Sequence, residues 1–177
     1  MRQQIAPNSH FRALLYNEPA KTLIAHFQRK VSDNNWINEL YTRATDAPSY
    51  AKIAAENDLL SFDYPVTAAA VPLLYFNAIQ WAKDGGGNWH SVRCLDLRSG
   101  QMTTVASPAT TPAPPDYVGL WISSLMAVDA DGQRLICSTG FERAIDERSK
   151  HVDYWVCALS VQNKVPEQIA SLPGTFF

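Results

Sequence analysis

The chain has 177 residues, of which 46% are hydrophobic and 18% charged, so it is long enough to bury a core and too apolar for a disordered protein. Fifteen Lys and Arg against 17 Asp and Glu give a net charge of −2. The sequence has no run of Lys and Arg, so we do not expect nucleic acid as a partner. The longest apolar stretch, VTAAAVPLLYF, is too short to cross a bilayer, and the N-terminal stretch lacks the continuous apolar segment of a signal peptide. We therefore expect a soluble, cytoplasmic protein without membrane contact, folded as a single domain over residues 1–177.

The first predicted element is a β-hairpin over residues 11–29. Two runs of β-prone residues flank the polar stretch NEPAK, whose Asn and Pro are typical of a turn.

Residues 32–58 interrupt the β pattern. In SDNNWINELYTRAT, apolar side chains fall at i, i+1, i+4 and i+5, which is the spacing of one helical stripe; they are Trp36, Ile37, Leu40 and Tyr41. The following SYAKIAAENDLL suggests a second short helix. The pattern predicts a small helical hairpin inserted between β units, which would either cover a sheet edge or form a partner surface.

A second β unit, a meander, is expected over residues 70–106. It ends in VRCLDLRSGQMTTVA (92–106), which aligns without a gap with FRALLYNEPAKTLIA (11–25). A third copy, WVCALSVQNKVPEQIAS (155–171), fits with one or two extra residues in its turn. Each copy places two short β-prone runs around a polar turn, so the sequence predicts a repeated hairpin unit.

The last meander is expected over residues 117–172. Its DADG stretch is interpreted as a turn, in which Asp129 accepts local backbone N–H groups and Gly132 has a positive φ. The preceding SPATTPAPPDY (107–117) holds four prolines and cannot pair as a central strand, so it is expected to be a connecting loop.

Two stretches of these meanders, LDLRSGQ (95–101) and DADGQRLICS (129–138), carry a resemblance to a known fold family. They resemble the outer hairpin and the strand-entering turn of β-propeller blades of the Tol and tryptophan-aspartate repeat kinds. The resemblance covers 70–177, with a fainter echo at 11–29, but the Trp-Asp and Gly-His signatures are missing. It implies a mainly β fold of antiparallel meanders, either propeller-like or a partial propeller, since a chain of this length allows about three or four blades. A fragment of a larger ring, closure by oligomerisation, and a curved antiparallel sheet unrelated to propellers are the alternatives.

Reactive chemistry has little support in the sequence. The three cysteines, Cys94, Cys137 and Cys157, lack metal-type spacing, and Cys94 and Cys157 fall in the middle of predicted strands, so free thiols are expected. We expect no catalytic residue, no metal site and no cofactor.

The candidate binding residues are aromatic and polar side chains of the last two meanders, because Trp and Tyr are the most enriched side chains in binding hot spots. They are Trp89, His90, Tyr117, Trp121, His151, Asp153 and Trp155. We therefore predict a non-enzymatic binding or interaction protein whose partner is another protein, such as an inhibitor or an immunity-type protein.

Three alternatives to this function stay open. The chain could be a small-ligand or carbohydrate-binding module built on Trp89, Trp121 or Trp155, or a subunit of a larger propeller. It could also be an enzyme, which a close cluster of His90, His151 and Asp153 would favour. Self-association is open as well.

Overall fold

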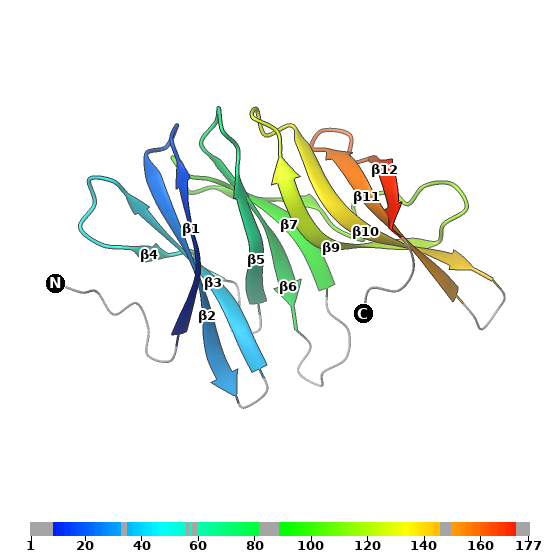
Figure 1. Ribbon diagram of the computed structural model, residues 1–177, viewed down its shortest axis with the longest axis horizontal. Coiled ribbons are helices and arrows are strands. Elements are labelled where there is room, and N and C mark those ends of the chain that lie inside the picture. The colour runs from blue at the N-terminus through cyan, green and yellow to red at the C-terminus, as the bar shows by residue number, and fades with distance from the viewer. Residues whose placement is uncertain are drawn as a thin grey trace.

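The computed structural model describes residues 9–32, 35–55, 57, 60–81, 89–145 and 150–172. Within them lie twelve strands, which form three four-stranded antiparallel sheets that follow one another along the chain (Figure 1). The first sheet contains β1 (Ser9–Asn17), β2 (Thr22–Ser32), β3 (Asn35–Ala44) and β4 (Ala51–Lys52). The second contains β5 (Leu60–Thr67), β6 (Leu73–Gln80), β7 (Trp89–Asp96) and β8 (Met102–Ala106). The third contains β9 (Gly119–Val128), β10 (Arg134–Ala144), β11 (Lys150–Ser160) and β12 (Pro166–Leu172).

Local turn chemistry explains why neighbouring strands pair as hairpins. Between β7 and β8, Asp96 Oδ1 accepts hydrogen bonds from the backbone N–H groups of Arg98 and Ser99, at 2.8 and 3.0 Å. Between β9 and β10, Asp129 Oδ1 accepts from the backbone N–H of Gln133 at 2.7 Å, and Gly132 has φ +72°. The turn predicted at DADG is confirmed, because a short Asp side chain and a residue that tolerates positive φ are both present.

The three sheets pack face to face in a row, with the first sheet at one end and the third at the other (Figure 1). We call the contact between the first and second sheets the first interface, and that between the second and third sheets the second interface. The first interface has nine buried core residues among those described: Ile24, Leu40, Ile53, Leu60, Phe62, Leu74, Phe76, Ala78 and Leu95. The second has fourteen: Ala68, Tyr75, Val92, Cys94, Val105, Ala106, Leu120, Ile122, Leu125, Leu135, Cys137, Phe141, Cys157 and Leu159.

Polar side chains join each sheet to a turn of the next. Asn17, at the end of β1, donates its amide to the carbonyl oxygens of Ala68 and Val71 in the β5–β6 turn, at 3.1 and 3.0 Å. Tyr75 of β6 donates its hydroxyl to the carbonyl oxygen of Gly132 in the β9–β10 turn, at 2.7 Å. Both contacts fix the position of one sheet relative to the next without a covalent link.

The predicted helical hairpin at 32–58 is wrong, since the described part of this segment contains no helix. Residues 35–44 form β3, which pairs with β2 along nearly its whole length, and 51–52 form β4. The apolar spacing misled because residues four apart share a face in a strand as well as in a helix. Trp36 and Leu40 lie on one face of β3, and Ile37 and Tyr41 lie on the other.

The prediction of a mainly β protein of antiparallel sheets is confirmed. The repeated hairpin, however, occupies different places in the sheets. The copies at 92–106 and 155–171 form the last two strands of the second and third sheets, whereas the copy at 11–25 forms the first two strands of the first sheet. Among the described residues, no helix is long and apolar enough to cross a membrane.

Candidate binding site

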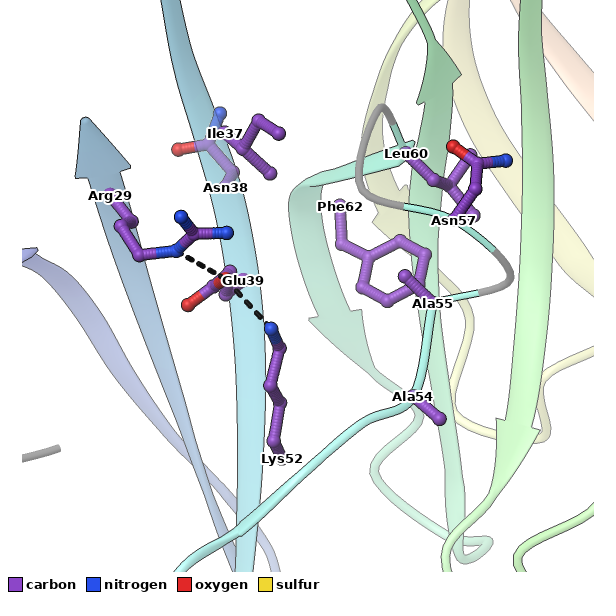
Figure 2. A pocket seen from close by; sticks show the side chains of 10 residues that line it. All are labelled: Arg29, Ile37, Asn38, Glu39, Lys52, Ala54, Ala55, Asn57, Leu60 and Phe62. Carbon is purple, nitrogen blue, oxygen red and sulfur yellow. Dashed lines mark hydrogen bonds and ion pairs between the residues drawn. The ribbon is translucent and has the colours of Figure 1, made fainter. Parts of the chain in front are cut away.

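A groove runs along the part of the β3 edge that β4 leaves uncovered. The short β4 pairs only with Tyr41 and Thr42, so the rest of this edge faces the second sheet, where the backbone N–H of Asn38 donates to Ser61 Oγ at 2.8 Å. The groove has a volume of about 510 Å³, within the usual range of small-molecule sites. Its described lining comes from β2, β3, β4, β5 and the segment between β4 and β5 (Figure 2).

One wall of the groove is charged and centres on Glu39 of β3, which is only 4% exposed. Glu39 Oε1 accepts hydrogen bonds from Arg29 Nε at 2.8 Å and from Lys52 Nζ at 2.7 Å (Figure 2). Its Oε2 accepts from the hydroxyl of Tyr41 at 3.0 Å. The sheet register explains this convergence: Arg29 pairs with Ile37 and Lys52 with Tyr41, so both cations are diagonal neighbours of Glu39 on the same face.

These contacts set the ionisation of the charged wall. Burial raises the pKa of Glu39, but the hydrogen bonds from Lys52, Arg29 and Tyr41 outweigh it and hold that pKa below its ordinary value. Burial and then the Glu39 carboxylate raise the pKa of Tyr41 to about 12. At neutral pH the wall therefore carries an ionised Glu39 and two cations, and so a net positive charge.

The opposite wall of the groove is apolar. Phe62 and Leu60 of β5 face it together with Ala54 and Ala55 (Figure 2). The ring of Phe62 also packs against Phe76, with centroids 4.9 Å apart, which fixes this wall from behind. An anionic group could bind at the cations while an apolar group lies against Phe62.

Four of the seven residues predicted from the sequence come together on the third sheet. Asp153 Oδ2 accepts from the hydroxyl of Tyr117 at 2.9 Å, and Asp153 Oδ1 lies 3.1 Å from His151 Nε2. The ring of Trp155 packs on Tyr117 at 5.2 Å and on Phe141 at 4.4 Å. Tyr117 ends the proline-rich loop at 107–117, so this cluster attaches that loop to the sheet.

The other three predicted residues lie elsewhere. Trp121 is on the opposite face of the third sheet, flat against Gly140 and 6.2 Å from the ring of Tyr154. His90 lies against the backbone of β9 in the second interface, where burial lowers its pKa although backbone hydrogen bonds oppose the shift. The side chain of Trp89 is outside the described residues. His90 therefore does not join His151 and Asp153 in one cleft.

A second group of titratable side chains lies buried in the first interface. His26 Nε2 is 3.9 Å from Asp63 Oδ1, and Nε2 has no hydrogen-bond partner among the described residues. Burial and then the charge of Arg12 lower the pKa of His26 to about 4, against a weaker opposing contact with Asn38. Burial raises the pKa of Asp63.

The cysteines are unsuited to nucleophilic chemistry. All three are free and buried. Burial raises the pKa of Cys94 and of Cys137, and it raises the pKa of Cys157 to about 12. Because the thiolate is the reactive form, thiols with raised pKa values are inert at neutral pH. Among the described residues, no three His, Cys, Asp or Glu side chains are grouped as metal ligands.

Comparison with known proteins supports the fold and leaves the activity undefined. The sequence matches no protein-family profile and no curated protein. The structure is similar to the acylaminoacyl peptidase of Pyrococcus horikoshii, with a TM-score of 0.55, 11% identity, and coverage of 93% of this chain and 25% of the peptidase. It is also similar to the β-propeller domain of the Trilobed protease from Pyrococcus furiosus, described as having an open velcro topology, with a TM-score of 0.53 and 10% identity. That match covers 94% of this chain and 43% of the protease domain, so this chain spans less than half the length of either neighbour.

The groove residues were not found from the sequence. Arg29, Glu39 and Lys52 come from three strands and meet only through the register of the first sheet. A signal in the sequence was Glu39 in the short stretch INELY, because a charge on a buried strand is unusual unless it is paired.

Proposed function

We propose that this chain is a non-enzymatic binding protein whose groove takes a small organic anion with an apolar group. The observation that carries the proposal is the pairing of two cations, held by a buried carboxylate, with an apolar wall across a cavity of about 510 Å³. The finer likeness to Tol-type or tryptophan-aspartate repeat blades is part of the same proposal, and the turn geometry at Asp96 and Asp129 supports it.

Preorganisation favours an anion in this groove. Glu39 already fixes both cations, so a ligand would not have to order two long side chains by itself. Arg29 contacts Glu39 through Nε, and its two terminal nitrogens are the atoms that would make a bidentate contact with a carboxylate or phosphate. The net positive charge of the wall attracts an anion before any contact forms.

We propose binding and no catalysis because the reactive groups that the structure describes are poorly suited to catalysis. The buried thiols have raised pKa values, and Asp153, which contacts His151, accepts a hydrogen bond from Tyr117 that attaches a loop. The groove holds an ionised acid already saturated by three donors, which is a poor general base.

The test is calorimetric titration of the chain with phenyl phosphate, phenylacetate and the neutral phenylacetamide. We expect both anions to bind and the amide to bind at least about tenfold more weakly, the effect of losing one charge-assisted hydrogen bond. Lys52→Gln should weaken the anions by a similar factor.

Arg134→Gln is the matched control. It also removes an exposed ion pair, that of Arg134 with Glu167 at 2.6 Å, but this pair lies on the third sheet, away from the groove. It should leave both affinities unchanged. Equal binding of anion and amide, or no binding of either anion at millimolar concentration, would contradict the proposal.

A further inference from the structure

The outward face of the first sheet is apolar along β1 and β2, and no described segment covers that part. Towards β4 the same face carries Arg29, Glu39 and Lys52, the charged wall of the groove. Along β1, the large side chains of Phe11, Leu14 and Tyr16 are 59%, 54% and 44% exposed. Phe11 begins an aromatic row across the sheet, with ring centroids 5.6 Å from Phe27, which in turn lies 5.6 Å from Tyr41. This end face points away from the second sheet, because Leu15 and Ile24, which alternate with these residues, pack into the first interface.

No segment among the described residues covers the outward face of the third sheet either. Leu135 and Cys137 of β10 point into the second interface, so Ile136 and its cross-strand neighbour Ala127 are on the opposite face. Trp121 lies flat on this face, where a Cβ on Gly140 would come within 2.6 Å of its ring. The glycine leaves space for the half-buried Trp121 to lie flat, so the face is apolar around Trp121 and Ile136. The same face also carries the Ser124–Ser138 hydroxyl pair and the Arg134–Glu167 ion pair.

The two ends carry opposite charge. Residues 9–55 hold six Lys and Arg against four Asp and Glu, a formal charge of +2. Residues 116–172 hold five against eight, a formal charge of −3. A contact between the first sheet of one molecule and the third sheet of another would therefore be electrostatically attractive, whereas first-to-first or third-to-third contact would be repulsive.

We propose that the occupant of both faces is a second copy of the same chain. Two copies would pack head to tail, the first sheet of each against the third sheet of the other, and close a ring of six sheets. The size agrees: one copy covers 43% of the propeller domain of the Trilobed protease, so two copies approach the length of that domain. The inference needs no ligand in the groove, although the charged wall of the groove lies on the same outward face, beside the apolar part at β1 and β2.

Sedimentation and light scattering of the ligand-free chain test this arrangement. The ring predicts a dimer of twice 19.7 kDa. Because each copy contributes both faces, Leu14→Glu on the first sheet and Ala127→Arg on the third should each give monomers. A mixture of the two variants should recover a heterodimer, because one interface is then unaltered and the other pairs opposite charges. Val165→Glu is the control, since Val165 is 53% exposed in the β11–β12 turn, away from both faces; it should stay dimeric.

Several results would overturn the proposal. A monomeric wild-type chain would show that no second copy covers the faces. A dimer that Leu14→Glu breaks and Ala127→Arg does not would indicate a first-to-first contact instead. Polydisperse larger species would show that head-to-tail packing does not close at two copies.

Discussion

The two inter-sheet interfaces of this protein are built differently. The second interface has the larger apolar core, with fourteen buried hydrophobic residues among those described, although His90 and the buried Asn77 also lie in it. The first interface has nine, and beside them lie the buried His26 with the half-buried Asp63, and the groove with Glu39. The same four-stranded unit thus has a larger apolar core on one side and a groove on the other, where we propose that a ligand binds. This division fits the general observation that ligand sites occur between packed units and at edges that regular pairing leaves free.

A matched pair of leucine truncations gives the largest expected contrast. Leu135 and Leu40 are both fully buried, the first in the second interface and the second in the first interface, where it pairs with His26. Leu135→Ala should cost about 4–5 kcal/mol because the larger apolar core is closely packed, and Leu40→Ala about 2–3 kcal/mol because the smaller core beside His26 and Asp63 can collapse further. Urea unfolding of both variants measures the difference, and equal costs would contradict the proposed contrast between the interfaces.

The second expectation concerns acid stability and the first interface. Because the folded pKa of His26, about 4, is below its ordinary 6.5, the unfolded chain binds a proton more readily between these values. Stability should therefore fall as the pH drops from about 6.5 towards 4, by about 2 kcal/mol at pH 5 for this group. The raised pKa of Asp63 acts in the opposite sense, so the comparison is made between the wild type and His26→Gln. A wild-type decline that His26→Gln leaves unchanged would exclude His26 as its cause.

A smaller effect is expected at the charged wall of the groove. Glu39→Gln keeps the shape of the side chain but leaves Arg29 and Lys52 without their anion. Both cations are partly exposed, so water screens the loss, and we expect a cost of about 1–2 kcal/mol at neutral pH. The lowered pKa of Glu39 adds a signature: its stabilisation is present above pH 4.5 and is lost as the pH falls through the folded pKa. An unchanged urea midpoint at pH 7 would show that the wall is not held by Glu39.

The smallest expected effect comes from a single contact across the second interface. Tyr75→Phe removes the hydroxyl that donates to the Gly132 carbonyl, while the ring stays in the core. We expect a loss of about 1 kcal/mol, the usual net contribution of one hydrogen bond. Thermal unfolding would show it, and a loss of several kcal/mol would mean that this turn contact holds the two sheets together more than their apolar core does.

What the sequence could predict was local. The turns at Asp96 and Asp129 were recognisable because one short side chain and one glycine encode them within a few residues. The segment at 35–44 was assigned to a helix because apolar residues four apart share a face in both structures, and only long-range pairing with β2 distinguishes them. The sequence placed Tyr117 and Trp155 in the same meander. It did not indicate that their contact attaches a loop to the sheet.

The groove could not be predicted for a different reason. Arg29, Glu39 and Lys52 have no shared motif, and their convergence depends on the register of two strand pairs. Part of the β3 edge stays free, and forms the groove, because β4 is only two residues long. No local pattern in the sequence predicts so short a strand. Strand register is a property of the whole sheet, so the site became visible only with the fold.

The most direct test of anion binding in the groove is a titration of the isotope-labelled chain with phenyl phosphate, followed by nuclear magnetic resonance of the backbone amides. Binding in the groove should shift the amides of Asn38, Glu39, Lys52 and Ala55, and should leave that of Cys137 in the second interface unshifted. Shifts concentrated in the third sheet, or none at saturating ligand, would contradict the assignment of binding to the groove.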